Sequence, residues 1–271
     1  MTKTKIDIMS LAHVSASAVV GAVIFAAAVM PAGAAGEQRE LKEVNFTFEG
    51  PFGTFDRGQL QRGYKVYEQV CSGCHSLDLL SFRNLAEEGG PGFSPAQARV
   101  LAAEFPRQVL DGPDAFGDMF ERPGKPSDRF PPPFVNEAAA RASNSGAYPP
   151  DFSVLAKARE GGADYIYSLL TGYEEPPAHE EIREGMYYNP YFPGHQIAMA
   201  PPLSDDVVEY TDGAPMTVDQ YSKDVASFMM WAAEPKLEER KRIGFQVMVF
   251  LIVLAGLLYF TKQKLWRNID H

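Results

Sequence analysis

Both cysteines of this 271-residue chain fall in one pentapeptide, Cys71-Ser72-Gly73-Cys74-His75. The spacing C-x-x-C-H is typical of covalent haem attachment, in which two thiols add across the haem vinyl groups and the imidazole binds the iron. On a helical turn the two cysteines lie three residues apart on one face, and the histidine follows directly. The pattern therefore predicts one c-type haem held by Cys71, Cys74 and His75, and electron transfer as its chemistry.

Two other uses of a C-x-x-C pair compete with haem attachment. A closed zinc site needs about four ligands, and the chain has no second cysteine pair. A thioredoxin-like disulfide belongs beside a βαβ pattern, which residues 60–90 lack. A haem-free, membrane-anchored thiol–disulfide protein that uses Cys71 and Cys74 remains as the alternative from a different functional class.

A second iron ligand has to come from the methionines and histidines, because an electron-transfer haem commonly has two protein ligands and methionine raises the reduction potential. Met199 has alanines on both sides and a diproline directly after them. The small neighbours allow the loop to approach the haem face, and the prolines stiffen it. The residues alone favour Met199 and leave His195 as the second choice. The weaker candidates are Met119, Met186, Met216 and His179.

The N-terminus has the features of an export signal. Lys3 and Lys5 precede a small apolar run over residues 19–29, and an A-x-A cleavage site follows at residues 32–34. We therefore predict that residues 1–35 are a cleaved signal peptide. The alternative is a retained N-terminal anchor. The short apolar run and the small residues that follow it disfavour this alternative.

The C-terminal apolar run, residues 244–260, carries no charge over 17 residues, which is about 25 Å of helix and near the lower limit for crossing a membrane. We predict a transmembrane anchor over residues 244–261, with a basic juxtamembrane segment before it (236–243) and a cytoplasmic tail after it (262–271). A buried core helix is the alternative, but little chain remains to bury it. The export signal places the body, residues 36–235, outside the cytoplasm, because basic flanks on both sides leave the orientation open.

The net charge of −10 is unevenly distributed along the chain. Residues 1–35 carry net +1 and residues 236–271 carry net +4, so that −15 falls on residues 36–235. A body this negative argues against nucleic-acid binding and favours a basic protein partner through electrostatic steering. The simpler interpretation is that the charge only keeps the domain soluble.

The body is predicted to be mainly α, with helices joined by long Pro- and Gly-rich loops and without convincing strand pairs. Residues 56–59 form a capping box for a helix that ends in the haem motif. The apolar stripe of that helix is Leu60, Tyr64, Tyr67, Cys71 and Cys74. Further helices are predicted over residues 94–105, 151–160, 164–170 and from a second capping box at residues 217–220. Residues 112–150 are rich in proline and are predicted to wrap a ligand with little regular structure.

Five segments carry a family resemblance: RGYKVYEQVCSGCHSLD (62–78), MFERPGKPSDRFPPPF (119–134), YPPDFSVLAKAREGGADYIYSLLTGYEEPP (148–177), YYNPYFPGHQIAMAPPL (187–203) and DVASFMMWAAEPKLEERKRIGF (224–245). They resemble the cytochrome c1 family, the haem subunits of the ubiquinol–cytochrome c oxidoreductase (cytochrome bc1) complex, in a bacterial form. The segments follow the family's order and extend from about residue 44 to the end of the chain. The resemblance implies a cytochrome c-like haem domain with long Pro-rich wrapping loops and one C-terminal transmembrane helix.

The resemblance also implies a set of haem-binding residues. They are Cys71, Cys74, His75, Met199, Arg159 and Tyr165. Within this set it implies thioether bonds from both cysteines, axial ligation of iron by the histidine and the methionine, and a haem propionate near the arginine with the tyrosine close by. A guanidinium matches a carboxylate, which supports Arg159 on physical grounds; a solvated surface charge is the alternative. Some bacterial members have an additional disulfide, for which this chain has no further cysteines.

By resemblance, the haem accepts single electrons from the Rieske iron–sulfur protein and passes them to a soluble or anchored basic c-type cytochrome. The implied complex also contains cytochrome b, is dimeric, and is the proton-translocating quinol–cytochrome-c reductase, in which this subunit transforms no substrate. The implied location is the bacterial inner membrane, with lipid around the anchor and the haem domain on the periplasmic side. The alternative is an anchored c-type cytochrome of another respiratory chain, such as an oxidase subunit or a shuttle.

Overall fold

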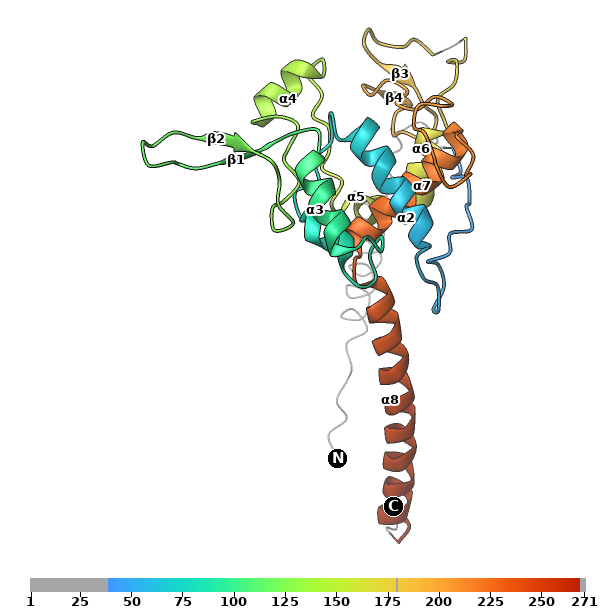
Figure 1. Ribbon diagram of the computed structural model, residues 1–271. Coiled ribbons are helices and arrows are strands. Elements are labelled where there is room, and N and C mark those ends of the chain that lie inside the picture. The colour runs from blue at the N-terminus through green and yellow to red at the C-terminus, as the bar shows by residue number, and fades with distance from the viewer. Residues whose placement is uncertain (1–38, 179, 269–271) are drawn as a thin grey trace, which may run out of the picture. The chain divides into compact units, whose positions relative to one another are not determined.

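The computed structural model describes residues 39–178 and 180–268 (Figure 1). The predicted signal peptide, residues 1–35, lies outside this part of the chain, as does the weak ligand candidate His179. Within it, regular structure is mostly helical, which confirms the mainly α prediction. The helices are α2 (Arg57–Val66), α3 (Pro95–Glu104), α4 (Glu137–Ser143), α5 (Leu155–Ala158), α6 (Gly162–Leu170), α7 (Val218–Ala233) and α8 (Leu237–Trp266).

Helix α2 begins at the predicted cap, where the Asp56 carboxylate accepts a hydrogen bond from the Gln59 backbone amide at 2.8 Å. After Val66 the chain winds more widely, as a π-helical turn over Tyr67–Cys71, and the helix ends there. The first three residues of the predicted stripe are buried, and Cys71 is half-buried. Cys74 lies beyond the helix in an exposed turn, so the stripe is one residue shorter than its spacing predicts.

Helix α7 crosses α2, and the two helices form the centre of the core (Figure 1). Thr217 caps α7 as predicted by accepting a hydrogen bond from the Gln220 amide at 3.3 Å. The crossing is close at Gly63, where a Cβ atom would lie 2.1 Å from the backbone oxygen of Asp224. Since only glycine lacks a Cβ, this residue allows the two backbones to approach each other. Much of the buried face of α7 is provided by Tyr221, Val225 and Phe228.

The Pro-rich segment 112–150 packs around this core through single rings. Phe130 is buried with its ring centroid 4.2 Å from that of Phe82 and 6.1 Å from that of Tyr67. Offset and edge-to-face ring pairs of this kind add to the burial of apolar area. The segment therefore packs on the helices, and whether it wraps a ligand stays a prediction. It also contains α4, a seven-residue helix that its prolines did not suggest.

Two short antiparallel strand pairs correct the expectation that strand pairs are absent. They are β1 (Val109–Asp111) with β2 (Phe120–Arg122), and β3 (Tyr187–Tyr188) with β4 (Gln196–Ile197). Strands of three and two residues are too short to show an alternating pattern in the sequence. The first pair is held by side chains, because the Arg122 guanidinium forms ion pairs with Asp111 and Asp128.

Two predicted helices differ from the structure in detail. The helix expected over 151–160 is only the single turn α5, because the Asp151 carboxylate accepts backbone hydrogen bonds from Ser153 and Asp78 and so holds the chain outside a helix (2.8 Å each). The helix expected over 94–105 is α3 with its reciprocal capping box present. Its buried face, however, consists of alanines 98 and 102, while Val100 is 51% exposed.

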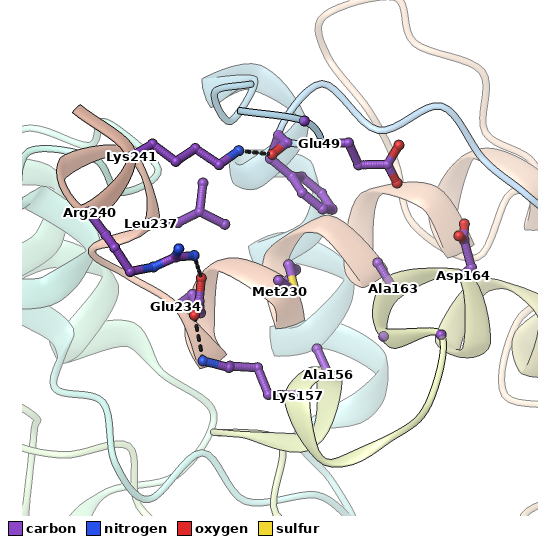
Figure 2. A pocket seen from close by; sticks show the side chains of 14 residues that line it. Glu49, Ala156, Lys157, Ala163, Asp164, Met230, Glu234, Leu237, Arg240 and Lys241 are labelled. Atoms are coloured by element: carbon purple, nitrogen blue, oxygen red, sulfur yellow. Dashed lines mark hydrogen bonds and ion pairs between the residues drawn. The ribbon is translucent and has the colours of Figure 1, made fainter. Parts of the chain in front are cut away.

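Helix α8 contains the predicted anchor, residues 244–261, within its 30 residues. Among the described residues it is the one helix long and apolar enough to cross a membrane, and it fits a membrane-anchored protein. Ion pairs connect its first turn to the domain, because the Glu234 carboxylate accepts hydrogen bonds from both Lys157 and Arg240 (Figure 2). Lys241 adds hydrogen bonds to the backbone oxygens of Phe48 and Gly53. These contacts border a cavity of about 410 Å³ where α8 begins.

Candidate haem-binding site

The C-x-x-C-H turn places His75 in a defined environment. The residue is only 9% exposed, and its ring stacks on Phe152 with the centroids 4.2 Å apart. Its Nδ1 atom lies 2.8 Å from the backbone oxygen of Pro150. Since a carbonyl oxygen can only accept, Nδ1 carries the proton and Nε2 keeps the lone pair that a metal needs. Burial lowers the pKa of His75 below its usual range, which also favours the neutral, ligating form.

The two cysteines are free thiols at the end of the helix. The backbone oxygen of Cys71 accepts hydrogen bonds from the amides of Cys74 (3.1 Å) and His75 (2.9 Å), which closes the turn and keeps the three residues together. Burial raises the pKa of the Cys71 thiol to about 12. A thiol–disulfide enzyme needs the opposite, a low pKa that supplies thiolate at neutral pH. This environment therefore disfavours the alternative of a redox disulfide at Cys71 and Cys74.

The predicted sixth ligand, Met199, lies in the loop that follows β4. Its backbone oxygen accepts a hydrogen bond from the Tyr173 hydroxyl at 3.0 Å. The hairpin before it is fixed by Asn189, a fully buried residue whose side-chain amide donates to the Leu169 oxygen at 2.8 Å and whose backbone amide donates to the His195 oxygen at 2.8 Å. Because Asn189 is fully buried and its hydrogen-bonding groups are paired, the β3–β4 hairpin is a firm support for the loop.

The second-choice ligand, His195, is part of that hairpin. Its backbone has a φ of +58°, in the left-handed region, and its Nδ1 atom lies 3.0 Å from Oε1 of Glu180. Nε2 is buried and has no hydrogen-bond partner within the described part of the chain. His195 and Met199 thus lie close in sequence, and the Glu180 contact at Nδ1 leaves the Nε2 atom of His195 without a partner among the described residues.

Arg159 and Tyr165, the residues implied near a haem propionate, lie on both sides of the start of α6. Tyr165 is buried, which raises its pKa, and the positive charge of the exposed Arg159 opposes that rise. Burial also raises the pKa of Tyr173, whose hydroxyl donates to the Met199 oxygen. The structure therefore pairs Arg159 with Tyr165 and joins Tyr173 to the Met199 loop.

The segment from Pro150 to Tyr165 carries several residues of the candidate site. Its start orients the His75 imidazole, and Tyr165 lies at its end. Sequence reasoning missed Phe152, Pro150 and Tyr173. A backbone oxygen leaves no signal in the residue type, and nothing within the segment 148–177 distinguishes these two aromatic residues from the others.

These residues suit a haem more than a bare metal ion. A neutral imidazole with its Nε2 free matches iron, and a thioether loop offers a second iron ligand. Two thiols three residues apart match the vinyl groups, and a guanidinium matches a carboxylate. Across residues 39–178 and 180–268, no group of three or more histidine, cysteine or acidic residues could hold a metal ion.

A mainly helical domain with a C-x-x-C-H turn, a supported methionine loop and one membrane-length helix is typical of a membrane-anchored c-type cytochrome. The sequence profile of the Cytochrome C1 family matches residues 46–269. The chain therefore belongs to the cytochrome c1 family, which confirms the resemblance seen in the sequence.

Bacterial relatives are similar along most of the chain. Cytochrome c1 of Blastochloris viridis is 47% identical over 262 residues, which cover 90% of this chain and 92% of the relative. Cytochrome c1 of Rhodospirillum rubrum is 43% identical over 270 residues, covering 92% and 97%. Cytochrome b/c1 of Bradyrhizobium diazoefficiens is 55% identical over 242 residues, covering 82% of this chain. The match spans only 35% of that longer protein.

Proposed function

We propose that this chain is the haem subunit of a bacterial cytochrome bc1 complex, which passes single electrons from the Rieske iron–sulfur protein to a soluble c-type cytochrome. Membership in the cytochrome c1 family supports the proposal, as do two bacterial relatives named cytochrome c1 that match over nearly their whole length. The subunit itself transforms no substrate; quinol oxidation and proton translocation belong to the complex. The name cytochrome b/c1 of the Bradyrhizobium relative supports a cytochrome b as partner.

The cofactor that we propose is one covalently attached haem c, which supplies reversible one-electron oxidation and reduction of its iron. Cys71 and Cys74 would hold it by thioether bonds, and His75 and Met199 would supply the axial ligands. Arg159, with Tyr165 beside it, would bind a propionate by a charge-assisted hydrogen bond. The observation that carries this proposal is the His75 imidazole, whose Nδ1 donates to the Pro150 oxygen and leaves Nε2 for iron.

The residues around the site have distinct tasks in this function. The Pro150 oxygen fixes the tautomer and the direction of the imidazole, as a hydrogen-bonding partner commonly does for a ligating histidine. The stacked Phe152 ring excludes water from one face of it. The net −15 on residues 36–235 would raise the encounter rate with a basic cytochrome, and salt would screen this effect.

We further propose a single-pass topology with the haem domain on the periplasmic side of the inner membrane. Helix α8 would be the anchor, surrounded by lipid, and residues after it would form the cytoplasmic tail. The cleaved signal peptide predicted over residues 1–35 supports this orientation, because export would leave residues 36–235 outside the cytoplasm. The complex would be dimeric.

A redox titration of the purified, haem-loaded complex tests the ligand assignment. Met199→Leu is expected to keep covalent haem and to lower the midpoint potential sharply, because the thioether favours reduced iron. Met186→Leu is the matched control and should leave the potential unchanged. An unchanged potential in Met199→Leu would assign the ligand to another residue.

The complex itself is tested by purification through a tag on this chain. We expect recovery of b-type haem and the Rieske protein together with covalent haem on this chain, seen by haem staining of a denaturing gel. Recovery of a terminal oxidase without b-type haem of the quinol reductase would support the oxidase-subunit alternative instead. Absence of covalent haem from protein made in a cytochrome-c-maturing host would contradict the proposed cofactor.

A further inference from the structure

The Met199 loop has little regular structure of its own. It runs from the end of β4 toward α7, and Met199 itself lies outside any helix or strand. A backbone of this kind would sample several positions unless something fixes it. Among the described residues, the hydrogen bond that Met199 makes is the one from the Tyr173 hydroxyl to its backbone oxygen, at 3.0 Å.

Tyr173 is well placed to fix this loop, because the end of α6 directly before it cannot shift. The Thr171 amide donates to the Tyr167 oxygen at 3.0 Å and closes the last turn. At Gly172 a Cβ atom would lie only 2.3 Å from the ring of Tyr191, so backbone and ring are already in close contact. The end of α6 therefore fixes the backbone of Tyr173, and this in turn fixes the position of its phenol hydroxyl.

Tyr173 contacts directly the loop that the proposed function assigns to haem binding, because its hydroxyl donates to the Met199 backbone oxygen. The tyrosine is half-buried, so water competes less for this hydrogen bond than at an exposed site.

We propose that Tyr173 is a positioning residue for the Met199 thioether: its hydroxyl holds the Met199 backbone oxygen and thereby sets where the loop presents the sulfur. The inference rests on the proposed function, because ligation by Met199 is itself a proposal. A net hydrogen bond in a half-buried site corresponds to about a fivefold change in an equilibrium constant. Loss of the Tyr173 hydroxyl should therefore favour the detached methionine about fivefold.

Tyr173→Phe in the haem-loaded, purified complex tests the inference, because it removes the hydroxyl and keeps the ring. Imidazole is the probe, since it competes with the methionine for ferric iron. We expect its apparent association constant to rise about fivefold, together with a weaker long-wavelength absorption band of methionine-ligated ferric haem. Tyr167→Phe is the matched control: it removes a hydroxyl from α6, six residues before Tyr173, and this hydroxyl donates to Asp219 at 2.6 Å instead.

Met199→Leu distinguishes ligation by Met199 from positioning by Tyr173. If imidazole binds this variant no more tightly than wild type, the proposed ligation fails and the positioning role fails with it. If Met199→Leu binds imidazole tightly but Tyr173→Phe behaves like Tyr167→Phe, the ligand assignment stands and the role of Tyr173 is refuted. A merely structural role for Tyr173 would lower the unfolding midpoint and leave imidazole affinity unchanged, and that result would refute the inference as well.

Discussion

Gly63→Ala should destabilise the domain, although alanine is the better helix former. In the structure the added Cβ would lie 2.1 Å from the Asp224 oxygen and 2.7 Å from the Phe228 Cβ, where ordinary contact begins at 3.4 Å. The α7 backbone would have to move away by about 1.3 Å, which is the difference between the 2.1 Å contact with the Asp224 oxygen and the 3.4 Å of ordinary contact. It is held in place, because the Asp224 carboxylate accepts hydrogen bonds from Arg62 and Tyr210 at 2.9 Å each.

The expected magnitude follows from two opposing effects. Overpacking against a backbone that cannot move costs about 3 kcal/mol, at the upper end of the usual range. The higher helix propensity of alanine returns about 1 kcal/mol. Gly63→Ala should therefore lower the free energy of unfolding by about 2 kcal/mol.

Gly58→Ala is the matched control in the same helix. Its Cβ would meet only the tips of the Asp56 and Arg62 side chains, at 3.3 and 3.5 Å. It should stabilise the domain by about 0.5–1 kcal/mol. Guanidinium unfolding of the detergent-solubilised, haem-loaded chain, followed by circular dichroism, measures both. If the two variants shift the unfolding midpoint in the same direction, the close crossing of α2 and α7 is not what the structure shows.

Three further predictions concern other interactions that stabilise the domain. Burial alone would raise the pKa of Glu234, but the ion pairs with Lys157 and Arg240 outweigh burial and hold this pKa below its usual value. Ionised Glu234 therefore stabilises the junction with α8 above about pH 4.5, and this contribution is lost as the pH falls. Glu234→Gln should lower the unfolding midpoint at pH 7, and its difference from wild type should shrink as the pH is lowered below 4.5; a difference that does not shrink in acid would contradict the ion pairs. Asn189→Ala should cost about 1–3 kcal/mol by leaving the Leu169 oxygen without its partner, and an unchanged midpoint would show that water replaces the amide. Loss of the α3 cap in Ser94→Ala should cost about 1 kcal/mol in the same unfolding assay.

The sequence predicted those parts of the fold that depend on local chemistry. The caps at Asp56, Ser94 and Thr217 are where polar side chains satisfy the first amides of a helix, and all three are present. The family segments placed the candidate site residues, which remain predictions. The structure adds that the Tyr173 hydroxyl contacts the Met199 loop.

Other features depend on contacts that residue types do not reveal. The π-helical turn before the C-x-x-C-H motif changes which side Cys74 faces, and no residue in it marks a wider winding. The helix expected over 151–160 is only one turn long, because the Asp151 carboxylate accepts a hydrogen bond from the backbone amide of Asp78, which is distant in sequence. Pro150 matters through its backbone oxygen alone. Long-range partners of this kind override local propensity.

The junction at Glu234 has a consequence for how electrons would travel. A swing of the domain about its anchor would have to break the ion pair between Arg240 and Glu234 and the bonds from Lys241 to two backbone oxygens (Figure 2). In the proposed complex, this junction would hold the haem domain at one height above the bilayer. The electron donor and the electron acceptor would then have to move in order to reach it.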